Sequence, residues 1–129
     1  MYGRLLAAFI MTLGSSGLAS AQDVNSDADA GAKVFKKCSA CHAADEAKNK
    51  IGPHLVGIID RPAGTIEGFK YSKALLEQAD AGLVWTAAEL ADYLKKPSAK
   101  IKGTKMSFPG LKKEKDVANI LAYLASLQK

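Results

Sequence analysis

The sequence contains few of the residues that cross-link small proteins or bind metals. Its 129 residues include two cysteines, two histidines, one tryptophan and four prolines. Two cysteines cannot form the several disulfides of a small secreted scaffold. No uninterrupted apolar run approaches the roughly 20 residues that a membrane-spanning helix requires. Any metal chemistry would have to use nearly all of the few nitrogen and sulfur ligands that the chain contains.

The composition is nevertheless that of a folded protein. Apolar residues make up 48% of the chain, which is enough for a packed core and too much for a largely disordered chain. The length fits one domain, or one domain preceded by a removable segment. Lysine and arginine outnumber aspartate and glutamate by 18 to 13, which gives a formal net charge of +5. The sequence has no internal repeat and no low-complexity tract.

Residues 1–21 have the pattern of a secretory signal peptide. Arg4 gives the segment a positive start, residues 5–13 form a short apolar stretch, and residues 19–21 read Ala-Ser-Ala. A charged start, an apolar middle and an A-x-A end are together typical of segments that direct export and are then cleaved.

Two other interpretations of this segment are weaker. A core helix would be broken at residues 14–17, which read Gly-Ser-Ser-Gly. An uncleaved anchor would have to span the bilayer with an apolar stretch that rises only about 13 Å as a helix. We therefore expect cleavage after Ala21, export to the periplasm, and a mature domain of residues 22–129. Cleavage would leave Met106 as the only methionine.

Four segments of the mature part carry the capping residues or the apolar periodicity of short helices. Their approximate ranges are 27–41, 72–79, 86–96 and 116–127. The first would be capped by Asp27 or Asp29, and the second by Ser72. In the third, Thr86 and Glu89 have the spacing of a capping box, and Pro97 ends the helix. The last is the clearest, because apolar residues recur along one face: Val117, Ile120, Leu121, Leu124 and Leu127.

The remaining segments, 45–70 and 98–111, are rich in glycine and proline and are predicted to be loops. No stretch shows the alternation of a β-strand. Loops of this length are uncommon in compact domains unless they have a function. A large apolar cofactor would organise the middle of such a chain.

The motif that carries chemistry is C-x-x-C-H at residues 38–42, the attachment signature of c-type haem. Residues three apart project from the same side of a helical turn, so Cys38 and Cys41 can both bond to the vinyl groups of one porphyrin edge. His42 can then turn its imidazole toward the iron. A thioredoxin-type dithiol would need a strand–helix–strand context. Zinc bound by the two cysteines, His42 and His54 would lack the usual spacing between ligand pairs.

A second axial ligand for the iron would be His54 or Met106. His54 follows His42 so closely that little chain would be left to wrap around a haem. Met106 lies 64 residues beyond His42, which is enough chain to reach the opposite face. A lone methionine is more often a core residue than a ligand, but the neighbours Lys105 and Ser107 are polar. We therefore favour Met106.

These residues resemble those of the class I cytochrome c family, of the bacterial cytochrome c2 type and similar to mitochondrial cytochrome c. The resemblance covers about residues 31–128. Besides the haem motif it includes residues 52–55, 68–72, Trp85, Tyr93-Leu94, Pro97, 103–106 and 121–124. It implies an all-α cytochrome c fold, with about four to five short helices and long loops wrapped around one covalently bound haem c.

The resemblance also implies roles for individual residues. The carbonyl of Pro53 would accept a hydrogen bond from His42 Nδ1. Tyr93 would form a hydrogen bond near the Met106 sulfur, and Thr104 would brace the same loop. Three side chains would donate hydrogen bonds to the buried haem propionates: Arg61, Tyr71 and Trp85.

The sequence departs from the family pattern at a few positions. Leu75 stands where the family often has a polar asparagine, so a hydrogen bond near one propionate would be missing or supplied differently. Lys102 stands where mitochondrial members have proline. The stretch at residues 76–81 is a few residues longer than theirs. None of these changes affects the expected ligands.

The functional expectation is a soluble periplasmic one-electron carrier and not an enzyme. With His42 and Met106 both bound, the iron would have no site for a substrate, and a thioether ligand would favour the ferrous state. The alternatives are a peroxidase-like haem enzyme, in which Met106 would have to leave the iron, and a haem-based sensor.

Charge is segregated along the chain. Residues 95–115 contain eight lysines and one acid, whereas residues 60–92 contain six acids and three bases. We expect a lysine surface around the haem edge that docks transiently on acidic redox complexes. The expected docking lysines are Lys36, Lys37, Lys95, Lys96, Lys100, Lys102, Lys105, Lys112 and Lys113. The partner would be a quinol-cytochrome c oxidoreductase, a reaction centre, a terminal oxidase or a periplasmic dehydrogenase. We expect a monomer with no nucleic-acid partner and no stable membrane insertion.

The signal-peptide assignment predicts the mature amino terminus. N-terminal sequencing of the protein isolated from the periplasm should start at Gln22. A mature protein that retains residues upstream of Gln22 would contradict the assignment.

Overall fold

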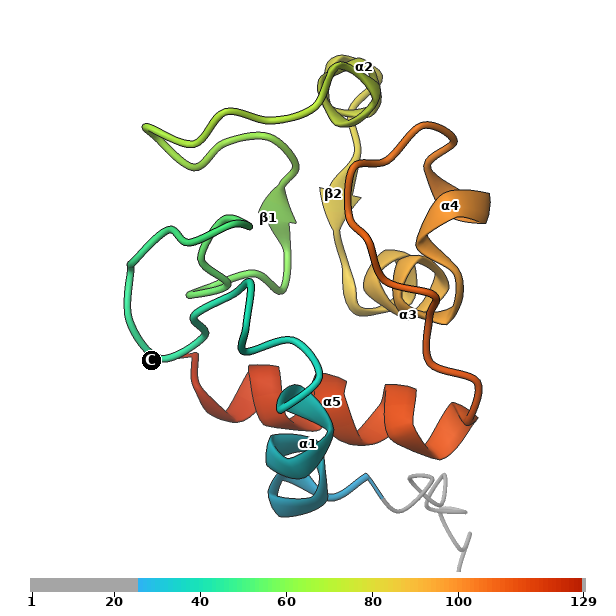
Figure 1. Cartoon of the computed structure of the whole chain (residues 1–129). Helices are drawn as coiled ribbons and strands as arrows, with labels where there is room; N and C mark the ends of the chain where they lie inside the picture. Colours follow the sequence, from blue (N-terminus) through green and yellow to red (C-terminus); the bar gives the residue numbers. More distant parts are fainter. Residues whose placement is uncertain (1–25, 129) are drawn as a thin grey trace, which may run out of the picture.

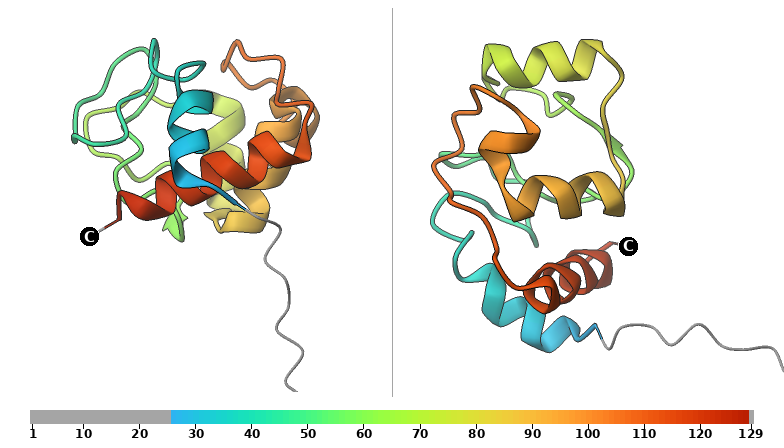
Figure 2. Two further views of the ribbon diagram at one scale, coloured as in Figure 1. Left: turned by 90° about the horizontal axis from the view of Figure 1, so that it is seen from below. Right: turned by 90° about the vertical axis from the view of Figure 1, so that its right-hand side faces the viewer.

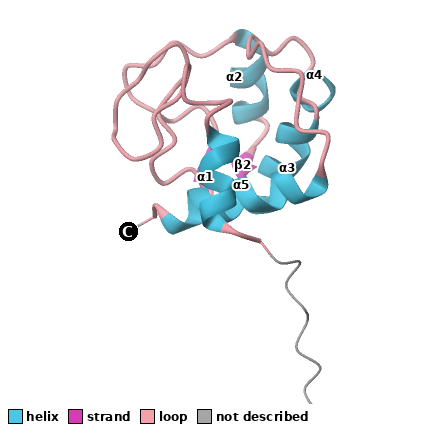
Figure 3. Ribbon diagram, turned by 60° about the horizontal axis from the view of Figure 1, so that its bottom comes forward, coloured by secondary structure: helices cyan, strands magenta, loops and turns pink. Residues whose placement is uncertain are grey.

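The computed structural model describes residues 26–128, so the expected signal peptide lies outside the described residues. The helices and the two very short strands follow one another along the chain as shown in Figure 1. Their bounds are α1 Ala28–Phe35, β1 Arg61–Pro62, α2 Lys73–Asp80, β2 Val84–Trp85, α3 Ala87–Lys95, α4 Pro97–Lys100 and α5 Glu114–Ser126. The predicted helical architecture with long loops is confirmed. The segment between α1 and α2 is mostly loop and occupies one side of the molecule (Figure 3).

Three helices begin at the capping residues that the sequence indicates. The side chain of Asp27 accepts hydrogen bonds from the first turn of α1, and that of Ser72 accepts one from the first turn of α2. Thr86 Oγ1 accepts from the backbone N–H of Glu89 at 3.2 Å. These bonds satisfy N–H groups that have no partner within the helix. The reciprocal half of the capping box is absent, because the N–H of Thr86 donates to the carbonyl of Val84.

The sequence-based prediction was wrong in three places. Helix α1 ends at Phe35 rather than near Cys41, and the chain continues in tight turns. Pro97 ends α3 but also begins α4, because a proline at the first position of a helix loses no hydrogen bond. The two strands pair antiparallel through two residues each, Arg61 with Trp85 and Pro62 with Val84. Strands this short have no alternation that a pattern search could detect.

Helices α1 and α5 cross in close contact, as both views in Figure 2 show. A Cβ atom on Gly31 would lie 1.9 Å from the carbonyl oxygen of Asn119, so only glycine allows the two backbones to approach this closely. The rings of Phe35 and Tyr123 pack nearby with 5.4 Å between their centroids. The buried Asn119 side chain accepts a hydrogen bond from the N–H of Asp27 at 2.9 Å. The crossing therefore connects the two ends of the domain.

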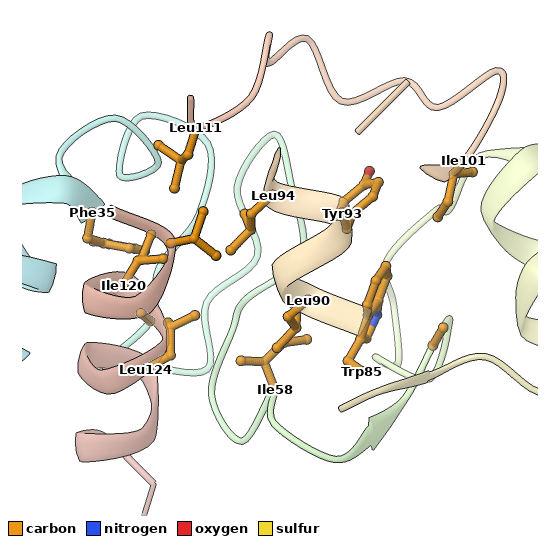
Figure 4. Packing of buried hydrophobic residues seen from close by; sticks show 13 residues of the cluster. Phe35, Ile58, Trp85, Leu90, Tyr93, Leu94, Ile101, Leu111, Ile120 and Leu124 are labelled. Carbon is orange, nitrogen blue, oxygen red and sulfur yellow. The ribbon is translucent and has the colours of Figure 1, made fainter. Parts of the chain in front are cut away.

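One hydrophobic core extends from this crossing to the strands (Figure 4). Its larger buried side chains come from α1, α3, α5, β2 and the loops: Phe35, Ile58, Trp85, Leu90, Tyr93, Leu94, Ile101, Leu111, Val117, Ile120 and Leu124. No helix within the described part of the chain has the length and apolar character needed to cross a bilayer.

The helix crossing generates a stability prediction. Replacing glycine by alanine inside a helix normally stabilises it by about 0.5–1 kcal/mol. At Gly31 the new Cβ would instead collide with the backbone of α5, so we expect Gly31→Ala to lower the free energy of unfolding by about 1–3 kcal/mol in denaturant titrations. The control is Gly82→Ala, whose Cβ would meet no atom within 4 Å and which tests only the cost of its positive φ. An unchanged or raised stability of Gly31→Ala would contradict the proposed close contact.

Candidate functional site

The two cysteines lie on the turn that follows α1. The N–H of Cys38 donates to the carbonyl of Phe35 at 2.8 Å, and the N–H groups of Cys41 and His42 both donate to the carbonyl of Cys38, at 3.0 and 2.9 Å. Because the two cysteines are three residues apart on this helical turn, they lie on the same face of it. Both are free thiols and both are half-buried. Burial raises the pKa of the Cys38 thiol, and the nearby charge of Lys37 opposes that effect.

The imidazole of His42 is held in one orientation. Its Nδ1 atom lies 2.7 Å from the carbonyl oxygen of Pro53. Because a carbonyl can only accept, Nδ1 carries the hydrogen and the Nε2 lone pair is left free for a metal. Burial lowers the pKa of His42, which favours the neutral ring that metal binding requires. The structure therefore brings together Pro53 and His42, the pair that the resemblance implied.

Gly52 completes the support of this ring, a role that the sequence reasoning missed. A Cβ atom on Gly52 would lie 2.3 Å from Cε1 of His42, so the backbone packs directly against the imidazole. The N–H of Gly52 also donates to the carbonyl of Cys41 at 2.8 Å. The Gly-Pro pair in the sequence marks a loop, but it does not say which side chain the glycine will lie against.

Met106 lies in the loop between α4 and α5, half-buried and packed against the hydrophobic core. The hydroxyl of Tyr93, on α3, lies 2.7 Å from Thr104 Oγ1, and the N–H of Met106 donates to the same oxygen at 3.3 Å. Burial raises the pKa of Tyr93, and the hydrogen bond with Thr104 opposes that effect. The three residues that the resemblance groups together are thus connected by hydrogen bonds.

The three expected propionate donors occupy different segments. Arg61 and Trp85 face each other in the β1–β2 pair, and Trp85 is buried against Tyr93 with 5.1 Å between ring centroids. The guanidinium of Arg61 donates to the backbone carbonyls of His54 and Val56, at 3.2 and 3.0 Å. Its charge is therefore held against the 54–56 loop.

Tyr71 lies outside this pair, in the loop before α2. Its hydroxyl oxygen accepts a hydrogen bond from the N–H of Ile66 at 3.0 Å, and its ring packs edge-on against Phe69. The oxygen is used as an acceptor, so its own hydrogen is available to an acceptor group.

His54 takes part in the structure of its loop. Its Nδ1 atom accepts a hydrogen bond from the N–H of Val56 at 3.2 Å, and its own N–H donates to the side chain of Asn49. Residues 26–128 contain no cluster of three or more His, Cys, Asp or Glu side chains that could hold a metal ion. The zinc alternative therefore gains no support.

The expected docking lysines are exposed, with one exception. Lys100 is half-buried, and its ammonium forms an ion pair with the carboxylate of Glu89. The exposed members are Lys36, Lys37, Lys95, Lys96, Lys102, Lys105, Lys112 and Lys113.

The donor set fits a covalently bound haem. The chain supplies two free thiols on one turn, an imidazole with a free Nε2, a glycine that makes room for that ring, and a thioether in a braced loop. This combination of two thiols, imidazole and thioether suits c-type attachment with two axial ligands.

Comparisons with known proteins agree with the assignment of a covalently bound haem. Residues 28–128 match the family model described as Cytochrome c. A cytochrome c-550 from Ancylobacter novellus is 54% identical over 95 residues, covering 73% of this chain and 89% of that protein. A cytochrome c2 from Rhodoblastus acidophilus is 48% identical over 103 residues, covering 79% of this chain and 94% of that protein.

A solved structure shows the same fold. The structure of cytochrome cH from Methylobacterium extorquens matches with a TM-score of 0.71 and 42% identity, covering 78% of this chain and 98% of that one. The expected cytochrome c fold is thereby confirmed. The chain belongs to the cytochrome c family, within the class I group of the bacterial cytochrome c2 type, whose covalently bound haem c serves electron transport.

Proposed function

We propose that this chain is an exported one-electron carrier whose haem iron is bound by His42 and Met106, and which docks transiently on redox complexes through its lysines. Bound haem supplies one iron that gains or loses a single electron. The observation that carries the proposal is the support of both expected ligands: His42 Nδ1 is held by Pro53, and the Met106 loop is held by Thr104 and Tyr93.

Support of this kind suits a carrier better than an enzyme. A ligand whose orientation is fixed by its neighbours moves little when the charge on the iron changes by one unit. An imidazole and a thioether as the two ligands would also favour the reduced state and so raise the reduction potential. With both axial positions filled by the chain, no position would be left for a substrate.

Three polar side chains are proposed to bind the haem propionates. Arg61 would supply a positive charge, Tyr71 a free hydroxyl hydrogen, and Trp85 its indole N–H. The β1–β2 pair keeps Arg61 and Trp85 in register, which supports a shared role. Buried carboxylates require such partners, because an unpaired buried charge is costly.

The exposure of eight of the nine expected docking lysines supports docking on an acidic partner. A patch of one charge sign speeds encounter without a large interface, which suits a carrier that must also leave. The partner class is a membrane-bound or periplasmic redox complex: a quinol-cytochrome c oxidoreductase, a reaction centre, a terminal oxidase or a dehydrogenase. The expected signal peptide, residues 1–21, supports a periplasmic location.

Removing the proposed thioether ligand tests the assignment. We expect Met106→Ala to lose the methionine-to-iron charge-transfer band of the oxidised protein and to bind imidazole readily. Its reduction potential should fall by at least about 0.1 V, a small part of the ~0.8 V range that axial ligands cover. The matched control is Ser107→Ala, which changes the same loop but removes no ligand. An unchanged potential and band in Met106→Ala would show that another group binds the iron.

The docking proposal predicts a salt-dependent reaction. The second-order rate constant for electron transfer to a purified terminal oxidase should fall at least about tenfold between ~10 and ~300 mM salt, because steering between opposite charges is screened. Lys105→Gln should lower the rate at low salt and reduce this dependence. Lys73→Gln serves as the control, because Lys73 is an exposed lysine on α2 outside the expected docking set. A rate that does not change with salt would rule out lysine-steered docking.

A further inference from the structure

Helix α3 holds the segment that carries Met106 at several points. The N–H of Leu111 donates to the carbonyl of Leu94 at 2.8 Å, and Gly110 lies so close to α3 that its Cβ would be 2.1 Å from the carbonyl oxygen of Lys95. These contacts secure the segment after Met106. The hydrogen bond between Tyr93 and Thr104 secures it just before Met106.

The start of the segment is anchored by the buried side chains of Pro97 and Ile101 and, in addition, by the ion pair between Glu89 and Lys100. Glu89 lies in the first turn of α3, and Lys100 is the last residue of α4, six residues before Met106. We propose that this ion pair is a positioning device for Met106: it fixes the start of the ligand segment on α3 and so limits how often Met106 leaves the iron. The inference rests on the proposed ligand role of Met106.

The ion pair between Glu89 and Lys100 is less exposed than an ordinary surface ion pair, so its two charges interact more strongly. The Lys100 side chain is 25% exposed and that of Glu89 38% exposed. The Glu89 Oε2 atom is shielded from solvent and accepts no hydrogen bond within the described residues, so its ion pair with the Lys100 ammonium is its only polar contact there. By comparison, Lys73 and Glu77 on α2 lie 3.7 Å apart with side chains 91% and 63% exposed. Charges that are partly removed from water interact more strongly, and an exposed pair contributes little.

Helix α4 needs an external anchor. It has only four residues and no side-chain cap at its start, and a helix this short is not stable by itself. Ile101, which follows directly, is 1% exposed and anchors the next position in the core. The carbonyl of Ile101 then accepts the N–H of Thr104, whose hydroxyl accepts the N–H of Met106. A displacement at Lys100 would therefore pass to its chain neighbour Ile101 and from there to Met106 through two consecutive hydrogen bonds.

The same geometry separates Lys100 from the other lysines. Lys100 is less exposed than the other eight expected docking lysines and its ammonium is paired with Glu89, so we assign its contribution to the ligand segment rather than to the partner. The pair lines a solvent-open surface depression with Gln78 and Leu83, so neutral replacements of similar size have room to be accommodated.

The test measures how often the ligand segment opens. In the oxidised holoprotein, imidazole binds the iron only after Met106 has left, so its binding rate reports the open population. We expect Glu89→Gln and Lys100→Met each to raise this rate about fivefold, and the double variant to raise it no further than either one. Amide hydrogen exchange at Thr104 and Met106 should speed up in parallel.

Controls separate the pair from general effects of charge. Glu77→Gln removes the acid of the exposed pair on α2 and should leave the imidazole rate unchanged. Additive effects of the two single substitutions would mean that Glu89 and Lys100 act independently, and this would overturn the inference. Unchanged rates in both variants would overturn it as well. A parent protein that lacks the methionine-to-iron band would instead refute the ligand role of Met106, and with it both proposals.

Discussion

The close crossing of α1 and α5 is the constraint on which the rest of the structure depends. Gly31 lets the two backbones approach, and Asn119 caps the crossing by binding the N–H of Asp27. Because the Cys-x-x-Cys-His turn follows α1 directly, its position is determined by this crossing. Two helices from opposite ends of the domain thus provide a fixed base for a haem-attachment turn that has little secondary structure of its own.

The two expected iron ligands are supported in different ways. His42 is held from within its own half of the chain, by the backbone of Gly52 and Pro53. Met106 is held by a separate element, because α3 contacts the ligand segment before and after it. Through these contacts the rigid helix α3 keeps the Met106 loop in a defined position, which a free loop of that length would not keep.

Most of the fold could be predicted from the sequence because its signals are local. The caps at Asp27, Ser72 and Thr86 and the apolar stripe of α5 need only neighbouring residues to be recognised. The β1–β2 pair was missed, because two-residue strands carry no periodicity. At the site, the haem motif and Met106 could be named from residue type and spacing. The support by Gly52 and the pairing of Glu89 with Lys100 could not, since both depend on which segments meet in space.

The β1–β2 pair also has a consequence for how this chain tolerates change in length. The pairing of Pro62 with Val84 holds the two ends of residues 63–83 side by side, and this segment contains α2. Closing a longer loop costs little additional entropy. Residues can therefore be inserted or deleted within this segment without moving Arg61 away from Trp85. The extra residues expected near 76–81 fall inside this segment, so they change its length without disturbing the β1–β2 pair.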